Sequence, residues 1–127
     1  MWPFSKKTLD LNKIEIHLHF WGDESEPTYT VKLSVDKLEV LECLGFIQGS
    51  DFRLSNIVTV PAFRRRGFGT TVVGTLIGAA RARQCSTFTL EDVSPRNTGA
   101  INIYQRFGAV ALPPKPSNGH SDYQIRL

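Results

Sequence analysis

The sequence predicts a mixed α/β (α+β) domain in which an antiparallel run of strands is followed by alternating helices and strands. Between residues 14 and 60, apolar residues alternate with polar ones at the two-residue period of half-buried strands. After residue 69, apolar residues recur at helical spacing. With 127 residues, of which 41% are hydrophobic and 21% charged, the chain is expected to form a single domain over residues 1–127.

Four strands are expected in the first half of the chain. Apolar residues occupy every second position over residues 14–20 and again over residues 29–33, with a polar turn between the two segments. Residues 36–48 fit either a short helix or a strand, and Gly45 with the β-favouring residues after it favours a strand. A fourth strand is expected from Phe52 to Val60, because Pro61 cannot continue a central ladder.

The second half is expected to alternate helices and strands. A helix is predicted over residues 69–83, where Gly74 and Gly78 would let it lie close to a sheet. A strand is expected over residues 87–93, and Asn97 can then cap a helix that ends near Gly108. Residues 110–127 are expected to close the domain as a hairpin. The apolar face of the first helix comprises Val72, Val73, Leu76, Ile77 and Ala80.

Charge is distributed unevenly along the chain. Residues 1–51 hold five basic and nine acidic residues, whereas residues 52–127 hold ten basic and three acidic residues. This excess suggests that the second half binds an anion, for which nucleic acid, membrane phosphate and a phosphorylated cofactor all qualify, unless it is only a solvated basic face. The first apolar residues precede the first lysines, the reverse of a secretory signal, and two cysteines make no disulfide framework. We therefore expect a cytoplasmic protein with reduced thiols.

The segment 58–70 carries the strongest chemical signal. It places the end of a strand, three consecutive arginines, two glycines and the start of a helix in succession. Helix N-terminal amides favour an anion, glycines let the backbone approach it, and arginines donate paired hydrogen bonds to phosphate. The segment fits neither a P-loop, which needs a lysine, nor a dinucleotide fingerprint, whose third glycine would replace Val72. What remains is Arg-x-x-Gly-x-Gly, beginning at Arg64.

With its surroundings, this loop resembles the GCN5-related N-acetyltransferase (GNAT) family. The resemblance is carried by Leu44-Gly45-Phe46-Ile47, by Ile57-Val58-Thr59-Val60-Pro61, by the Arg-x-x-Gly-x-Gly loop, and by Asn97-x-x-Ala100-x-x-x-Tyr104-x-x-x-Gly108. It covers about residues 43–109. It implies a mixed, largely antiparallel sheet with two main helices, in which a central parallel strand pair splays apart to admit acetyl-CoA.

The resemblance also implies a role for each matching residue. Backbone groups of Val58 and Val60 would bond the pantetheine arm of acetyl-CoA, and Asn97 would contact the same arm. Tyr104 would be the general acid that protonates the leaving thiolate. Arg64 occupies the leading position of the motif and could instead support the loop. The pyrophosphate would be wrapped by Arg65, Arg66, Gly67, Phe68, Gly69 and Thr70.

The chemistry leaves alternatives open at this point. A tyrosine stays protonated near neutrality and can donate a proton, although a core aromatic residue would show the same helical spacing as Tyr104. Asn97 could be only a helix cap. A protonated amine acceptor needs a base or a water chain, and the candidate bases are His17, His19, Glu91 and Asp92.

Two features depart from the family pattern. The family inserts two helices between its first two strands, and their loop forms one wall of the acceptor pocket. Here about seven residues separate Phe20 from Thr28, so these N-terminal helices are expected to be missing. The acceptor side is then open, which suits a protein or peptide lysine, or is completed by a second subunit in a homodimer. The family's Gly-Phe after the tyrosine helix is replaced by Gly108-Ala109.

We therefore expect an N-acetyltransferase that transfers acetyl from acetyl-CoA to a primary amine, either of a small molecule or of a protein or peptide lysine. Direct attack is expected, because neither Cys43 nor Cys85 falls in the motif region, and neither has partners for a metal site. The alternative is a non-catalytic CoA- or acyl-CoA-binding protein. Neither nucleic acid nor a membrane is expected as a partner, because stacking platforms, a long basic stripe and a long apolar span are missing.

Overall fold

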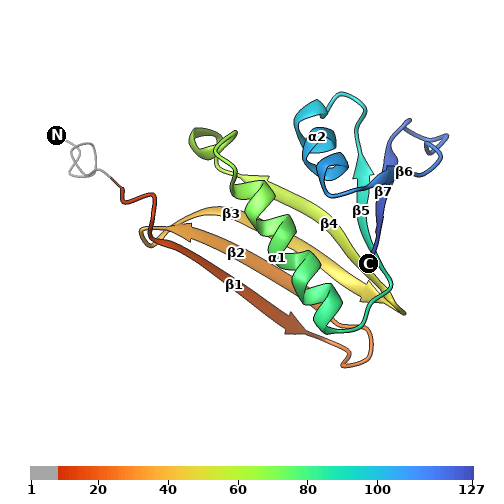
Figure 1. Cartoon of the computed structure of the whole chain (residues 1–127), viewed down its shortest axis with the longest axis horizontal. Coiled ribbons are helices and arrows are strands. Elements are labelled where there is room, and N and C mark those ends of the chain that lie inside the picture. The colour runs from red at the N-terminus through yellow and green to blue at the C-terminus, as the bar shows by residue number, and fades with distance from the viewer. Residues whose placement is uncertain (1–8) are drawn as a thin grey trace.

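A computed structural model describes residues 9–127, which form a seven-stranded sheet with two α-helices (Figure 1). The helices are α1 (Phe68–Ala82) and α2 (Thr98–Arg106), and a short 3-10 helix, η2 (Pro61–Phe63), precedes α1. The strands are β1 (Ile14–Trp21), β2 (Thr28–Val35), β3 (Leu38–Gln48), β4 (Asp51–Thr59), β5 (Thr87–Val93), β6 (Val110–Ala111) and β7 (Ser121–Arg126).

The strand order is β1-β2-β3-β4-β5-β7-β6, and the β4–β5 pair is parallel whereas all the other neighbours are antiparallel. The predicted fold class, a largely antiparallel mixed sheet with one central parallel pair, is therefore confirmed. Residues 36–48, which fitted either a helix or a strand, contribute the strand β3. Tertiary pairing decides this, because β3 bonds both β2 and β4 along its length.

Helix α1 crosses the sheet and packs on its buried face, where it contacts β4 and β5 (Figure 1). Its five predicted apolar residues are all buried, and they belong to the same core as the fully buried Tyr29, Val31, Leu33 and Val35 of β2. The expectation for its two glycines was wrong. Gly78 is exposed, and a Cβ there would meet nothing within 4 Å, whereas a Cβ at Gly74 would meet Phe107 at the end of α2. Gly74 therefore accommodates a helix neighbour.

Both α-helices lie on the same side of the sheet, since Gly74 of α1 lies against Phe107 and Gly69 lies against Ile103 of α2. Only the turn 22–27 joins β1 to β2, so the two helices that the family inserts there are absent from this part of the chain. Ala109, which follows α2, is buried in the core. No helix within residues 9–127 is long and apolar enough to cross a membrane.

Candidate active site at the divergence of β4 and β5

The parallel pair β4–β5 is short and opens into a groove. The two strands pair only from Asp51–Thr87 to Leu54–Leu90, although β4 continues to Thr59. Irregularities in both strands accompany the separation: the β3–β4 register shifts at Leu44/Gly45, and the β5–β7 register shifts between Leu90 and Val93. A groove of about 1120 Å³ fills the opening between β4, the loop before α1, the end of β5, and α2.

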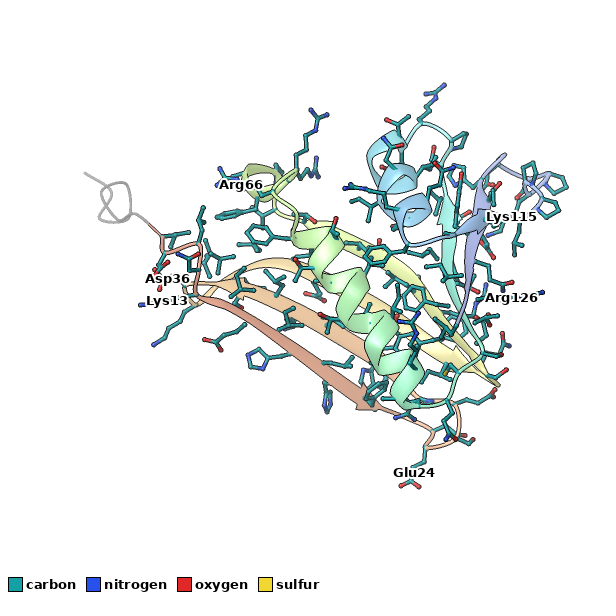
Figure 2. All side chains as sticks on the ribbon, viewed as in Figure 1. Lys13, Glu24, Asp36, Arg66, Lys115 and Arg126 are labelled. Carbon is teal, nitrogen blue, oxygen red and sulfur yellow. The ribbon has the colours of Figure 1, made fainter. Side chains whose placement is uncertain are left out.

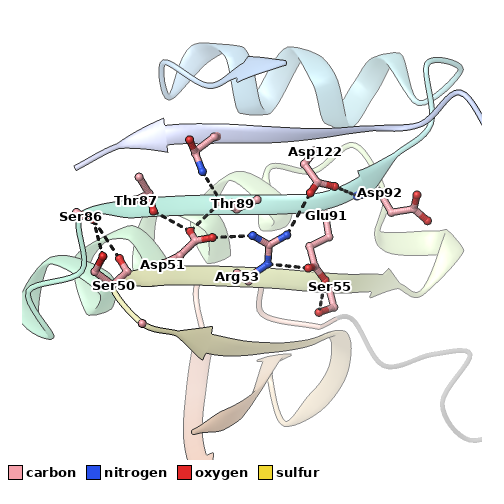
Figure 3. Close-up of polar contacts among 12 residues, drawn as sticks. Ser50, Asp51, Arg53, Ser55, Ser86, Thr87, Thr89, Glu91, Asp92 and Asp122 are labelled. Carbon is pink, nitrogen blue, oxygen red and sulfur yellow. Dashed lines mark hydrogen bonds and ion pairs between the residues drawn. The ribbon is translucent and has the colours of Figure 1, made fainter. Parts of the chain in front are cut away.

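An ionic network closes the base of this opening (Figure 3). The guanidinium of Arg53 donates to Glu91 on β5 at 2.7 Å, to Asp51 at 2.6 Å and to Asp122 on β7 at 3.1 Å. Ser55 donates to the other oxygen of Glu91 at 2.8 Å. Because Arg53 immediately precedes the last paired residue of β4, this side chain joins three strands at the point where two of them part.

The loop before α1 presents backbone amides to the groove. Arg65 and Gly67 both adopt positive φ, 61° and 84°, and this turns the chain sharply into the helix. The first turn of α1 contains no acidic residue, so nothing there offsets the positive end of the helix dipole. A Cβ at Gly67 would meet nothing within 4 Å, and one at Gly69 would meet only Ile103 across the groove at 3.8 Å. The backbone is thus accessible to an anionic ligand.

The structure brings most of the predicted site residues together. Eight line the groove: Val58, Arg65, Gly67, Phe68, Gly69, Thr70, Asn97 and Tyr104. Val60 instead lines a neighbouring groove over β3 and β4. Arg66 stacks its guanidinium 5.5 Å from the ring centroid of Phe63 and lies on the side of the loop that faces away from α2 (Figure 2).

Tyr104 lies in the wall of the groove that α2 provides. The residue is 7% exposed, and burial, with a smaller contribution from the neighbouring Cys43, raises its pKa to about 12. No group within residues 9–127 forms a hydrogen bond with its hydroxyl, although the ring packs 6.3 Å from that of Tyr123. Tyr104 is thus both a core aromatic residue and a protonated hydroxyl at the groove.

Asn97 caps α2, as predicted, by accepting a hydrogen bond from the amide of Ala100 at 3.2 Å.

Several residues at the groove escaped the sequence analysis. Arg96, next to Asn97, lines the groove, and so does Arg106 in the last turn of α2. Their only sequence signal was their position beside the Asn97–Tyr104 motif. Arg53 gave no signal, because its partners come from three strands.

The four candidate bases are not placed alike. His17 and His19 are exposed on β1, which β2 and β3 separate from β4, so they lie away from the groove. Glu91 lines the groove but is bound by Arg53 and Ser55. Asp92 also lines it, but a hydrogen bond from Asn118, with Lys115 nearby, lowers its pKa.

No cation-binding cluster accompanies these groups. Among residues 9–127, no three His, Cys, Asp or Glu side chains are arranged to hold a metal ion. The two thiols are buried: Cys43 is 1% exposed, and burial raises its pKa to about 12. Burial also raises the pKa of Cys85.

Fold and site together define a mixed α/β protein whose sheet opens at a parallel pair into an arginine-lined groove. The chain belongs to the Acetyltransferase (GNAT) family, whose sequence profile matches residues 2–109. Comparison with curated proteins gives no match.

Solved structures share the fold. A GNAT family acetyltransferase from Elizabethkingia anophelis with acetyl-CoA bound is 14% identical, with a TM-score of 0.71, over 91% of this chain and 99% of that one. The PaiA N-acetyltransferase of Thermoplasma acidophilum in complex with coenzyme A is 11% identical, with a TM-score of 0.71; 79% of this chain aligns with 61% of that chain. The ribosomal-protein-S18-alanine N-acetyltransferase of Escherichia coli is 20% identical, with a TM-score of 0.65, over 84% and 70% of the two chains.

Proposed function

We propose that this protein binds acetyl-CoA in the β4–β5 groove and transfers the acetyl group to a primary amine. One observation carries the proposal: the strands part after Leu54 and Leu90, and the opening brings the arginine-glycine loop and Tyr104 into a single groove. Membership of the acetyltransferase family and the CoA-bound structures of the same fold support it.

The residues present fit such a ligand. The amides at the start of α1, with Arg65, would hold the pyrophosphate, and Gly67 and Gly69 leave room for it. Beyond Leu54, β4 has no ladder partner on its β5 side among the described residues, so backbone groups around Val58 can bond the amides of the pantetheine arm as a second strand would. Arg96 and Arg106 would add positive charge from the opposite wall.

Tyr104 is proposed as the general acid. In the transfer, the neutral amine nitrogen bonds to the acetyl carbon and the carbon–sulphur bond breaks. The departing sulphur takes the phenol proton of Tyr104, which then regains a proton from solvent. The raised pKa keeps this proton in place at neutral pH, and no protein group competes for the hydroxyl within residues 9–127.

Solvent is the proposed acceptor of the amine proton. Glu91 is bound by Arg53 and Ser55, and Asp92 has a lowered pKa, so neither is placed as a strong base. A water chain in the open groove can carry the proton away. Direct transfer without an acyl-enzyme follows from the burial of Cys43 and Cys85, whose raised pKa values keep both thiols protonated.

Calorimetric titration of acetyl-CoA tests the binding step. We expect Arg65→Gln, at the groove, to weaken binding about tenfold, because a charge-assisted bond to phosphate is lost. Arg81→Gln, in the last turn of α1 and away from the groove, is the matched control and should bind as the wild type does. Failure of the wild-type protein to bind millimolar acetyl-CoA would refute the proposal.

A turnover assay distinguishes an acetyltransferase from a non-catalytic CoA-binding protein. Release of free CoA should depend on an added amine and should fall in Tyr104→Phe without loss of acetyl-CoA affinity. Tight binding with no turnover over a broad panel of amines and lysine peptides would instead identify a CoA or acyl-CoA sensor. The absence of the two helices between β1 and β2 is the observation that favours this second function.

A further inference from the structure

Strand β1 forms one edge of the sheet, and its outer side has no partner strand among residues 9–127 (Figure 1). It pairs with β2 in eight consecutive register pairs, from Ile14–Val35 to Trp21–Thr28, without a bulge. Half of its backbone N–H and C=O groups therefore point outward with no ladder bond. Such a row of donors and acceptors is a template for an added strand.

The two edges of this sheet are protected differently against such pairing. The opposite edge is β6, which is only two residues long and is followed by three prolines within residues 113–116. Short strands, prolines, lysines and bulges are the devices that commonly protect an edge. β1 has none of them, because it is eight residues long, pairs without a bulge and contains neither proline nor lysine. A long edge of this kind predicts a partner strand.

The core-facing side chains of β1 are incompletely covered. Ile16, Leu18 and Phe20 pack against the core but are only half-buried, because the sheet ends beside them. The residues opposite them on β2 are fully buried. A strand added beside β1 would remove more of this apolar surface from water.

The sequence of β1 is self-complementary when two copies pair antiparallel about His17. Directly opposite residues of an antiparallel pair share one face of the sheet. On the core-facing side the aliphatic and aromatic residues meet one another, and on the exposed side an imidazole N–H can donate to a carboxylate. The opposite pairs, each between the two copies, are Ile14–Phe20, Ile16–Leu18 and Glu15–His19.

The neighbouring register is less complementary. Centring the pair on Leu18 would place His17 opposite His19 and Glu15 opposite Trp21. The carboxylate would then have no donor opposite it, and four imidazoles would be crowded on one face. Charge complementarity therefore favours the register centred on His17.

We propose that two copies of this chain associate through β1, antiparallel and centred on His17, and so join their two seven-stranded sheets. Each copy offers one long edge to a two-fold axis, and β6 closes the other edge, so the assembly stops at two copies. β2 and β3 separate β1 from β4, so the interface lies away from the candidate cofactor groove. The inference therefore does not rest on the proposed function and leaves the acceptor side open.

Sedimentation velocity over a concentration series up to about 0.5 mM tests the association. We expect a concentration-dependent dimer, and His17→Glu should raise its dissociation constant about tenfold or more, because two carboxylates then face each other across the axis. The variant should still fold, since Lys32 of the same copy lies opposite position 17 on β2. Gln105→Glu, exposed on α2, makes the same change in net charge and should dimerise as the wild type does.

Disulfide formation between introduced cysteines tests the register. Directly opposite Cα atoms lie about 4.5–5.5 Å apart, within disulfide range, so His17→Cys should form a disulfide-linked dimer on oxidation. Glu15→Cys alone should not, because its two copies would be about 13 Å apart along the strands. A mixture of Glu15→Cys and His19→Cys should crosslink. The native Cys43 and Cys85 are buried and do not compete.

Three results would overturn the inference. The first is a wild-type protein that stays monomeric at every concentration. The second is a dimer that His17→Glu and Gln105→Glu affect equally, which would place the interface elsewhere. The third is crosslinking of His17→Cys with His19→Cys but not of His17→Cys with itself, which would exclude the register centred on His17. Titration of acetyl-CoA into His17→Glu tests the proposed function separately, because its affinity should equal that of the wild type.

Discussion

The hydroxyl of Tyr29 on β2 donates a hydrogen bond to the backbone carbonyl of Arg53 on β4 at 2.8 Å, across the intervening strand β3. It can reach that far because Gly45 of β3 lies beneath it and has no side chain. The same Arg53 anchors β5 and β7 through its guanidinium. The buried core and the point where β4 and β5 part are therefore joined through one residue.

Gly45→Ala should destabilise the protein by about 3 kcal/mol or more, because a Cβ there would collide with the Arg53 carbonyl and the Tyr29 hydroxyl. Gly78→Ala is the matched control: it lies on the exposed face of α1, has no neighbour in the way, and should stabilise by about 0.5–1 kcal/mol. Urea unfolding followed by circular dichroism measures both. Equal stability of Gly45→Ala and the wild type would contradict the close approach.

Arg53→Met should cost about 2–3 kcal/mol at neutral pH, since it leaves three carboxylates facing one another without their cation. The side chain is 18% exposed, so solvent moderates the loss. The cost should shrink in acid, where the carboxylates become protonated. Urea unfolding at several pH values checks this, with Arg53→Lys expected to recover part of the stability. A pH-independent cost would point to packing alone.

Asp122 should contribute to acid sensitivity. Burial opposes its ionisation, but the amide of Asp92, Lys115 and Arg53 together lower its pKa in the folded protein. A lowered folded-state pKa contributes stability above the ordinary pKa of 3.8, and this contribution disappears as pH falls through the folded-state value. The stability difference between wild type and Asp122→Asn should therefore narrow below about pH 4. A gap that widens in acid would reverse the sign of the shift.

Tyr104→Phe should lower kcat about 100-fold or more and leave acetyl-CoA affinity unchanged, as expected on loss of a general acid. Because the pKa of Tyr104 is about 12, kcat/KM for an amine should rise with pH up to about 10, as the acceptor loses its proton, with no falling limb from this tyrosine. Tyr123→Phe, at the neighbouring ring, is the control. Equal losses in the two variants would make Tyr104 a packing residue.

Incubation with acetyl-CoA in the absence of acceptor should give no acetyl adduct on Cys43 or Cys85. Both thiols are buried and have raised pKa values, so the reactive thiolate is scarce. Peptide mapping by mass spectrometry locates any adduct. An acetylated cysteine that disappears when an amine is added would establish an acyl-enzyme and overturn direct transfer.

The sequence by itself determined the elements and most of the candidate cofactor groove. The alternating and helical patterns placed the strands, the buried face of α1 and the Asn97 cap correctly, because local periodicity reports which side of an element is buried. The arginine-glycine loop was recognisable because its residues are contiguous, and a short loop keeps contiguous residues together in space.

Only the tertiary structure decided what depends on distant strands. The Arg53 network joins residues 51, 91 and 122, the reach of Tyr29 over Gly45 spans three strands, and the groove over β3 and β4 needs the register of one strand against the other. It also removed His17 and His19 from the candidate bases, because they lie on β1, and placed Val60 and Arg66 outside the groove that holds the other predicted residues. Pairing between strands, which sets these neighbours, is a property of the whole sheet and leaves no local pattern in the chain.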